Sequence, residues 1–140
     1  MTLRIVHADR SALFHNGVKR VFADNPDIDF VDHCGYLEQA LESLDIYKPD
    51  LLLTATNLYD TSNAVQAFCG HREQYMPEMK IIVLTMVSSL DFFLNGLVKG
   101  VDGYLTKEAT ADDIYSCVLD VSIGDRYLTV PDEVKRRTKE

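Results

Sequence analysis

The sequence lacks any apolar run that approaches the roughly 20 residues of a membrane-spanning helix. It is also poor in cysteine: Cys34, Cys69 and Cys117 are odd in number, far apart and without CxxC or Cys/His spacing. This pattern favours buried free thiols in a reducing compartment over disulfides or a zinc site. Residues 1–6 run directly into a strand pattern without signal-peptide architecture, so we expect a cytoplasmic location and no membrane partner.

Positive charge is scarce as well, since the formal net charge is -8. Nucleic-acid affinity begins with clustered lysine and arginine, so the body of this chain is not expected to bind phosphate backbones. A local exception is the basic stretch 135–139, which we interpret as a solvated tail or the start of a linker. We therefore divide the chain into a domain over 1–130 and a tail or linker over 131–140.

Signatures of enzymes and of cofactor sites are missing too. No glycine-rich phosphate loop follows the first predicted strand, where the residues are Asp9 to Ala12. No Ser-His-Asp or Cys-His constellation can be assembled. We predict no enzymatic activity, no cofactor and no metal site. The histidines show no spacing typical of metal ligands and are interpreted as structural or solvent-facing: His7, His15, His33 and His71.

What the sequence does contain is a regular alternation of strand and helix patterns. The organising stretch is Lys48 to Asn57, whose short apolar run is bounded on both sides, as in a strand buried on both faces. Ser11 and Thr110 are expected to begin helices and Gly100 to close one. Further strands are predicted at 3–8, 28–32, 80–86 and 101–106, and helices at about 11–25, 36–47, 62–75, 89–99 and from 110. The alternation predicts an α/β fold, a three-layer α/β/α sandwich around a five-stranded parallel sheet.

Four segments carry family motifs: Lys48–Leu53, Ile82–Met86, Gly100–Ala109 and Ile123–Leu128. In their order and placement they resemble the receiver domain of response regulators. The resemblance is strongest to the receivers that precede a helix-turn-helix in transcription regulators of the LuxR/NarL type. It covers about residues 3–130 and implies a flavodoxin-like sheet order 2-1-3-4-5.

The resemblance also implies what each pocket position does. In the family, an aspartate at the end of strand three accepts a phosphoryl group, and two acids after strand one help to hold Mg²⁺. A hydroxyl and a lysine meet the phosphoryl oxygens, so positioning and electrostatics carry the reaction. Here Asp9, Thr85 and Lys107 correspond to the first acid, the hydroxyl and the lysine. Arg10 stands in place of the second acid, and Ala55 in place of the phosphoacceptor.

Ordinary aspartyl phosphorylation is excluded at Ala55, because alanine has no atom that can accept phosphate. A single carboxylate beside a guanidinium is also a poor set of ligands for octahedral Mg²⁺. No substitute is found nearby. Asp50 lies at the start of the strand and Asp60 in the loop beyond the pocket, while strand alternation turns Thr54 and Thr56 away from the side of Ala55.

The remaining cations leave alternatives open for this pocket. Asp9 is expected to pair with Arg10 or with Lys107, and a surface ion pair of little energetic worth is the favoured form. Thr85 is also compatible with a simple cap of the following loop. Alternatively, the chain is a sensor that binds a small anionic molecule near Asp9, Arg10, Thr85 and Lys107.

The main functional hypothesis is an atypical, phosphorylation-independent receiver in signal transduction and transcription regulation. Tyr104 corresponds to the switch aromatic of the family, and the face of helix four, strand five and helix five would form a homodimer or bind a protein partner. DNA would be reached only through a domain outside this sequence. Whether the phenylalanines of this face are buried or exposed stays open. The candidate interface residues are Phe92, Phe93, Tyr104 and Tyr115.

Overall fold

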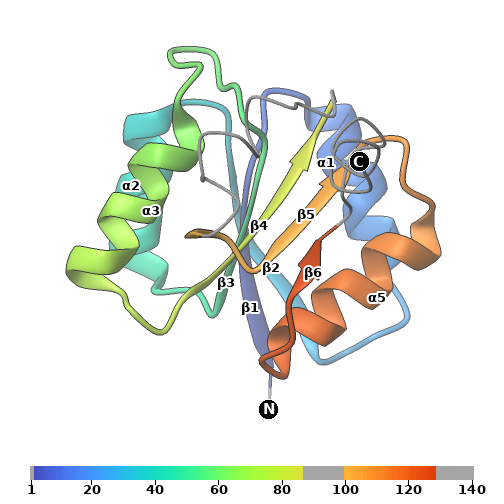
Figure 1. Cartoon of the computed structure of the whole chain (residues 1–140). Coiled ribbons are helices and arrows are strands. Elements are labelled where there is room, and N and C mark those ends of the chain that lie inside the picture. The colour runs from blue at the N-terminus through green and yellow to red at the C-terminus, as the bar shows by residue number, and fades with distance from the viewer. Residues whose placement is uncertain (1, 87–99, 129–140) are drawn as a thin grey trace, which may run out of the picture.

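A parallel β-sheet runs through the middle of the computed structural model, which describes residues 2–86 and 100–128 (Figure 1). The strands follow the order β2-β1-β3-β4-β5-β6, and each neighbouring pair is parallel. The flavodoxin-like order is confirmed, and the predicted strand count is wrong because the sheet has six strands. Their bounds are β1 (Leu3–Ala8), β2 (Ile28–Cys34), β3 (Leu51–Thr54), β4 (Lys80–Thr85), β5 (Gly103–Thr106) and β6 (Tyr127–Leu128).

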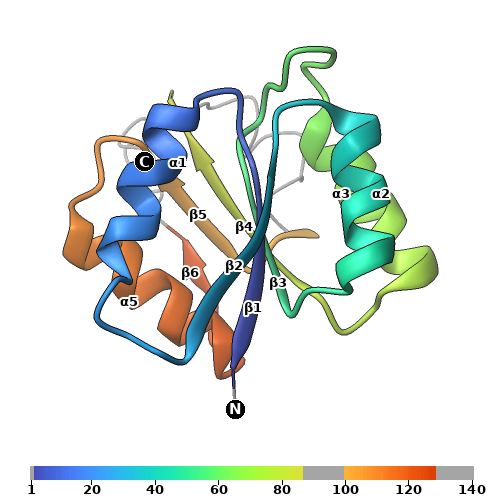
Figure 2. The ribbon, with the colours of Figure 1, turned by 180° about the vertical axis from the view of Figure 1, so that it is seen from behind.

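Helices cover both faces of this sheet, as parallel crossover connections require. Figures 1 and 2 show α2 and α3 on one face and α1 and α5 on the other, which confirms the three layers. The helix predicted at 89–99 and the tail at 131–140 lie outside the described residues. The described helices are α1 (Ala12–Val21), α2 (Leu37–Tyr47), α3 (Ala64–Tyr75) and α5 (Ala111–Ser122).

The organising strand β3 is buried on both of its faces. All of its residues are buried, and its three leucines alternate between two apolar clusters. Leu52 lies in the cluster that contains Phe68 of α3, whereas Leu51 lies in the cluster that contains Val18 of α1. A continuous apolar run is therefore the correct pattern for this strand, because no face of it meets water.

The predicted helix starts are confirmed by side-chain caps. Ser11 Oγ accepts the backbone N–H of Phe14 at 3.0 Å and begins α1. Thr110 Oγ1 accepts the N–H of Asp113 at 3.1 Å, and Asp113 Oδ2 accepts the N–H of Thr110 at 3.2 Å. This reciprocal capping box satisfies two backbone donors at the start of α5.

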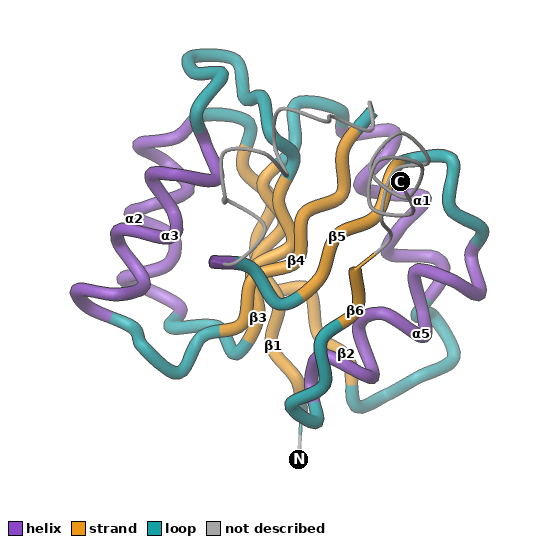
Figure 3. The backbone as a smooth tube through the Cα atoms, in the orientation of Figure 1, coloured by secondary structure: helices purple, strands orange, loops and turns teal. Residues whose placement is uncertain are grey.

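The sixth strand changes the setting of Tyr104. Tyr127 and Leu128 pair with Gly103 and Tyr104, so β5 is not the edge of the sheet along this part (Figure 3). Tyr104 is fully buried, whereas an edge strand would leave it half exposed. On the opposite face of β5, Gly103 permits the close approach of α5, because a Cβ there would lie 3.0 Å from the Sγ of Cys117 on that helix.

The three cysteines are free thiols, as predicted from their spacing. Cys34 and Cys117 are buried, and Cys69 is half-buried. Among the described residues, none of the helices combines the length and the apolar character needed to cross a lipid bilayer.

Candidate functional site

The pocket residues meet at the edge of the sheet where the strands end. The register places Ala8 opposite Thr54 and Thr85 opposite Thr106. Backbone hydrogen bonds continue beyond the strands, from Ala55 N to Ala8 O at 2.9 Å and from Lys107 N to Thr85 O at 2.7 Å. This pairing brings the loop residues Asp9, Ala55 and Lys107 to the same edge as Thr85, as the resemblance implies.

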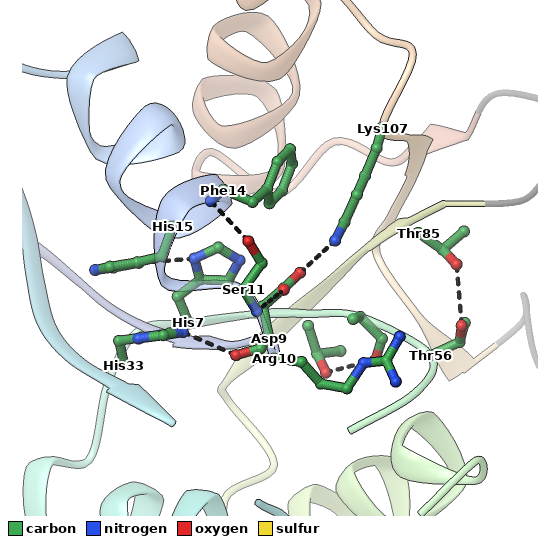
Figure 4. A network of polar contacts seen from close by, with 12 residues as sticks. His7, Asp9, Arg10, Ser11, Phe14, His15, His33, Thr56, Thr85 and Lys107 are labelled. Carbon is green, nitrogen blue, oxygen red and sulfur yellow. Dashed lines mark hydrogen bonds and ion pairs between the residues drawn. The ribbon is translucent and has the colours of Figure 1, made fainter. Parts of the chain in front are cut away.

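Asp9 and Lys107 form the central ion pair of this edge (Figure 4). Lys107 Nζ lies 2.8 Å from Asp9 Oδ2, and the side chains are only 14% and 2% exposed. The other carboxylate oxygen, Oδ1, accepts the N–H of Ser11 at 2.8 Å. The expectation of a surface ion pair is therefore wrong. The pair is buried, where loss of one partner costs on the order of 3–5 kcal/mol of stability.

Phe14 adds an aromatic contact to this ion pair. Lys107 Nζ lies 4.2 Å from the centroid of the Phe14 ring, within the range of a cation–π interaction. The lysine is thus held by a carboxylate and by the first turn of α1 together. Arg10, the other candidate partner of Asp9, has an exposed side chain, and its carbonyl oxygen accepts the hydroxyl of Tyr59 at 3.1 Å.

The hydroxyl of Thr85 contacts Thr56 rather than standing alone. The two Oγ1 atoms are 2.9 Å apart, which corrects the prediction that Thr56 points away from this pocket. The prediction assumed strand alternation, but β3 ends at Thr54, and Thr56 belongs to the following loop. Thr54 is fully buried and donates its hydroxyl to the carbonyl of Ala55, a residue that is itself 7% exposed.

The two nearby aspartates have structural roles away from the pocket, as expected. Asp50 Oδ2 accepts the N–H of Arg4 at 2.8 Å, at the start of the strands. Asp60 Oδ1 accepts the N–H of Leu37 at 2.9 Å and satisfies a donor at the beginning of α2. Both carboxylates are therefore engaged with backbone donors of other segments.

Tyr115, one of the candidate interface residues, packs within the molecule on one side of its ring. Its ring stacks on Phe22 with centroids 5.2 Å apart, and its hydroxyl accepts a hydrogen bond from Asn25 Nδ2 at 2.9 Å. Tyr115 is half-buried against the α1 side of the molecule. Tyr104 is buried as well, and Phe92 and Phe93 lie outside the described residues.

Three histidines gather beside the ion pair, an arrangement that sequence reasoning missed. His7 Nδ1 lies 2.9 Å from His15 Nδ1, and the rings of His15 and His33 stack at 4.3 Å with an interplanar angle of 4°. Burial, and then His15, His33 and Lys107, lower the pKa of His7 well below its usual value. The available signal was His7 itself, a polar residue between the apolar residues Val6 and Ala8. His71 lies elsewhere and contacts Asp45.

The carboxyl edge offers little to a metal ion. Over residues 2–86 and 100–128, no group of three His, Cys, Asp or Glu side chains is arranged to hold one. Asp9 already has a cation and a backbone donor as partners. Asp9 and Lys107 therefore neutralise each other's charge.

Comparison with known proteins shows which family and which relatives this chain resembles. Residues 5–119 match the family model described as the response regulator receiver domain. The chain is 32% identical over 126 residues to the transcriptional regulatory protein DegU of Brevibacillus brevis, covering 90% of this chain and 52% of DegU. It is 27% identical over 133 residues to the oxygen regulatory protein NreC of Staphylococcus carnosus, covering 90% and 58%. The chain thus spans little more than half the length of these relatives.

Solved structures share the fold. A LuxR-family two-component response regulator from Aurantimonas sp. superposes with a TM-score of 0.85 at 21% identity, with 100% of both chains covered. The isolated REC domain of RcsB from Salmonella enterica serovar Typhimurium, solved with the phosphomimetic BeF₃⁻, has a TM-score of 0.81 at 16% identity, covering 97% of this chain and 98% of that one.

Proposed function

Because this chain belongs to the response regulator receiver domain family, we propose that it is a receiver that signals without being phosphorylated. Ala55 carries the proposal. It follows β3 at the pocket edge, in the position where the family resemblance puts the phosphoacceptor aspartate. A methyl group has no lone pair with which to attack a phosphoryl donor, so no acyl phosphate can form there.

The charges around Ala55 support the same proposal. Asp9 is paired with Lys107, and Arg10 occupies the position of the second acid. A Mg²⁺ ion would have to displace the lysine and accept a neighbouring guanidinium, although it requires several oxygen ligands in octahedral geometry. We therefore propose no cofactor, no metal and no enzymatic activity for this pocket.

We propose that the output is dimerisation or contact with a protein partner, and through it the regulation of transcription. Two relatives support this proposal, a transcriptional regulatory protein and an oxygen regulatory protein, and both are longer than this chain. The proposed contact face comprises residues 89–99, β5 and α5. Binding to DNA would belong to a domain outside the present sequence.

The pocket proposal is tested with beryllofluoride and Mg²⁺, which together mimic a phosphorylated aspartate. The wild-type chain is expected to show no change in the amide NMR signals of Thr85 and Lys107 when both are added. The double variant A55D/R10D restores the two missing carboxylates on the same scaffold and serves as the matched positive control. Metal-dependent shifts in the wild-type chain would refute the proposal.

The proposed output is tested by light scattering across a concentration series. A mass that rises from one chain to two with concentration is the expected result for dimerisation. A single-chain mass throughout, together with no partner retained on the immobilised domain, would contradict the proposed output and leave the pocket proposal standing.

The alternative function, a sensor of a small anion, is less well supported by the contacts. The ammonium of Lys107 is already met by Asp9, and the hydroxyl of Thr85 by Thr56. Only Arg10 keeps an exposed cationic side chain among the four residues of that hypothesis. A thermal-shift screen with nucleotides and carboxylate metabolites distinguishes the two functions, and we expect a flat profile at millimolar ligand.

A further inference from the structure

Three of the four histidines converge from three separate elements beside the receiver pocket. His7 comes from β1, His15 from α1 and His33 from β2 (Figure 4). The ring centroid of His7 lies 5.1 Å from that of His15 and 5.8 Å from that of His33. His33 Nε2 contacts the backbone oxygen of Asp9 at 2.8 Å. The cluster therefore joins α1 to two strands and to the loop that holds the ion pair.

The hydrogen atoms of this cluster can be counted. The contact between the two Nδ1 atoms of His7 and His15 needs one hydrogen, so one ring donates and the other accepts. His33 donates its Nε2–H to the carbonyl of Asp9. His7 Nε2 is buried without a partner, and His7 has no exposed surface. The neutral cluster satisfies every close contact, but it already contains one unpaired buried nitrogen, which is costly.

The charged groups around the cluster disfavour further protons on its inner rings. Burial, followed by the charges of His15, His33 and Lys107, lowers the pKa of His7. Burial, His33 and Lys19 lower the pKa of His15, while Asp9 and Asp32 raise it. His15 is only half-buried and the charges of Asp9 and Asp32 favour its protonated form, so between His7 and His15 an added proton goes to His15.

We propose that His7, His15 and His33 form a proton-binding site. Acidification would open the contact between α1 and the sheet next to the receiver pocket that contains Ala55. Protonated His15 donates its Nδ1–H to His7. A second proton placed on His33 would stack two cationic rings face to face at 4.3 Å. A second proton placed on His7 would set two N–H groups against each other across 2.9 Å. Either way the cluster has to separate.

Separation would reach the ion pair through the first turn of α1. Phe14 precedes His15, contacts the His7 ring at 6.2 Å between centroids, and lies 4.2 Å below the ammonium of Lys107. Ser11, which caps the helix, is bound to Asp9. Movement of this turn therefore changes the surroundings of Asp9 and Lys107 without any phosphoryl group. Asp9 is not assigned as a metal ligand in this chain, since Lys107 holds it.

The inference rests on the proposed loss of phosphorylation in one respect: acidification then acts as the input signal in place of a phosphoryl group. Its test follows histidine titration in the absence of phosphate donors and metal, so either proposal can fail while the other stands. The measurement is an NMR titration of the 140-residue chain from pH 8 to pH 5. It records the imidazole signals together with the amides of Ser11, Phe14 and Lys107.

We expect the three amides to shift along with the His15 ring, and His7 to stay neutral until the amides change. The variant His15→Gln should lose the amide response, whereas His71→Gln, which alters the histidine outside the cluster, should keep it. Three rings that titrate independently at the ordinary value near 6.5, with amides unmoved, would overturn the inference. An unchanged response in His15→Gln would overturn it as well.

A second measurement keeps the inference testable if a variant folds poorly. The folded chain lowers the pKa of His7 and His15 below the unfolded value of 6.5, so the unfolded state binds more protons below that pH. The stability that the two neutral histidines contribute is therefore fully present above pH 6.5 and is lost as the pH falls below it. Urea titrations should show an unfolding constant that rises by up to about tenfold per pH unit for each histidine kept neutral. A flat profile from pH 7 to pH 5 would contradict the cluster.

Discussion

At the residue scale, the pocket is defined by how its own charges compensate one another. A buried carboxylate needs a partner, and in this chain the partner of Asp9 is a lysine of the same pocket. In the proposed function, Ala55 stands where a carboxylate would compete for that lysine. The pair would then be a fixed part of the structure instead of a receptor for a transferred group.

The first prediction concerns the two partners of this ion pair. The variant Lys107→Met should lose about 3 kcal/mol of unfolding free energy, because it leaves Asp9 charged, buried and paired with a single N–H. Asp9→Asn should cost less, about 1–2 kcal/mol, since a lysine at the rim can reach water. Urea unfolding at pH 7 measures both.

The double variant D9N/K107M completes this thermodynamic cycle. We expect its loss to be smaller than the sum of the single losses by about 1–3 kcal/mol, the signature of a direct interaction. Strictly additive losses would mean that the two side chains do not interact in solution.

The second prediction concerns thiol reactivity. Burial raises the pKa of Cys34 to about 11 and that of Cys117 to about 12, from an ordinary value of 9.0. The thiolate is the reactive form, so at pH 8 the native chain should alkylate at Cys34 about a hundredfold more slowly than the urea-unfolded chain. Mass spectrometry of iodoacetamide-treated samples measures this, and equal rates in the two states would contradict the burial.

The sequence could predict part of this site but not its contacts. The resemblance placed Asp9, Thr85 and Lys107 at one edge, because each ends or directly follows a strand in a known order. The contact of Thr56 with Thr85 was missed, because alternation stops where β3 stops. The histidine cluster was missed, because its members lie far apart in the chain and meet only after β1, α1 and β2 have packed.

At the element scale, β6 forms the edge of the sheet beside β5. Its two residues pair with β5, and the N–H of Tyr127 donates to the carbonyl of Asp102 at 2.9 Å. Tyr127 packs on the apolar cluster of the α1 side and Leu128 on that of the α3 side. A short strand thus contributes to both layers and shields Tyr104.

The third prediction tests this strand by truncation. A chain that ends at Gly124 loses β6 and should be less stable in urea by about 2–3 kcal/mol, from the apolar surface that becomes exposed. It should also self-associate more readily, because an uncovered strand edge offers unpaired backbone groups. A chain that ends at Leu128 keeps β6 and is the matched control. Equal stability of the two chains would contradict the role of β6.

Elements differed in how well their patterns identified them. The continuous apolar runs of β3 and β4 predicted buried strands, and both were found. Strand β6 escaped prediction, because two residues after a turn at Gly124 give no periodicity. Tyr115 was placed on the correct helix, but which neighbour its ring meets depends on how α1 and α5 pack together.

At the scale of the whole molecule, the charge balance predicts that this domain does not bind nucleic acid by itself. Lysine and arginine number 14 and aspartate and glutamate 22, so the chain as a whole repels phosphate backbones. The layered fold follows from the alternation of strands and helices, which the sequence showed clearly. Regulation of transcription would then require a separate DNA-binding domain.

The fourth prediction follows from this charge balance. The 140-residue chain should not bind a labelled DNA duplex at about 0.15 M salt and at protein concentrations up to about 100 µM. Fluorescence anisotropy measures the binding, and a chain without residues 131–140 is the control for the basic stretch. Low-micromolar affinity at that salt would contradict the view that DNA contact lies elsewhere.

The central claim, a receiver scaffold without phosphoryl chemistry, is tested most directly by intact-mass spectrometry after incubation with acetyl phosphate and Mg²⁺. Wild-type protein should keep its unmodified mass, while A55D/R10D, which regains both carboxylates, should gain one phosphoryl group. A stoichiometric mass increase of one phosphoryl group in the wild-type chain would contradict the claim.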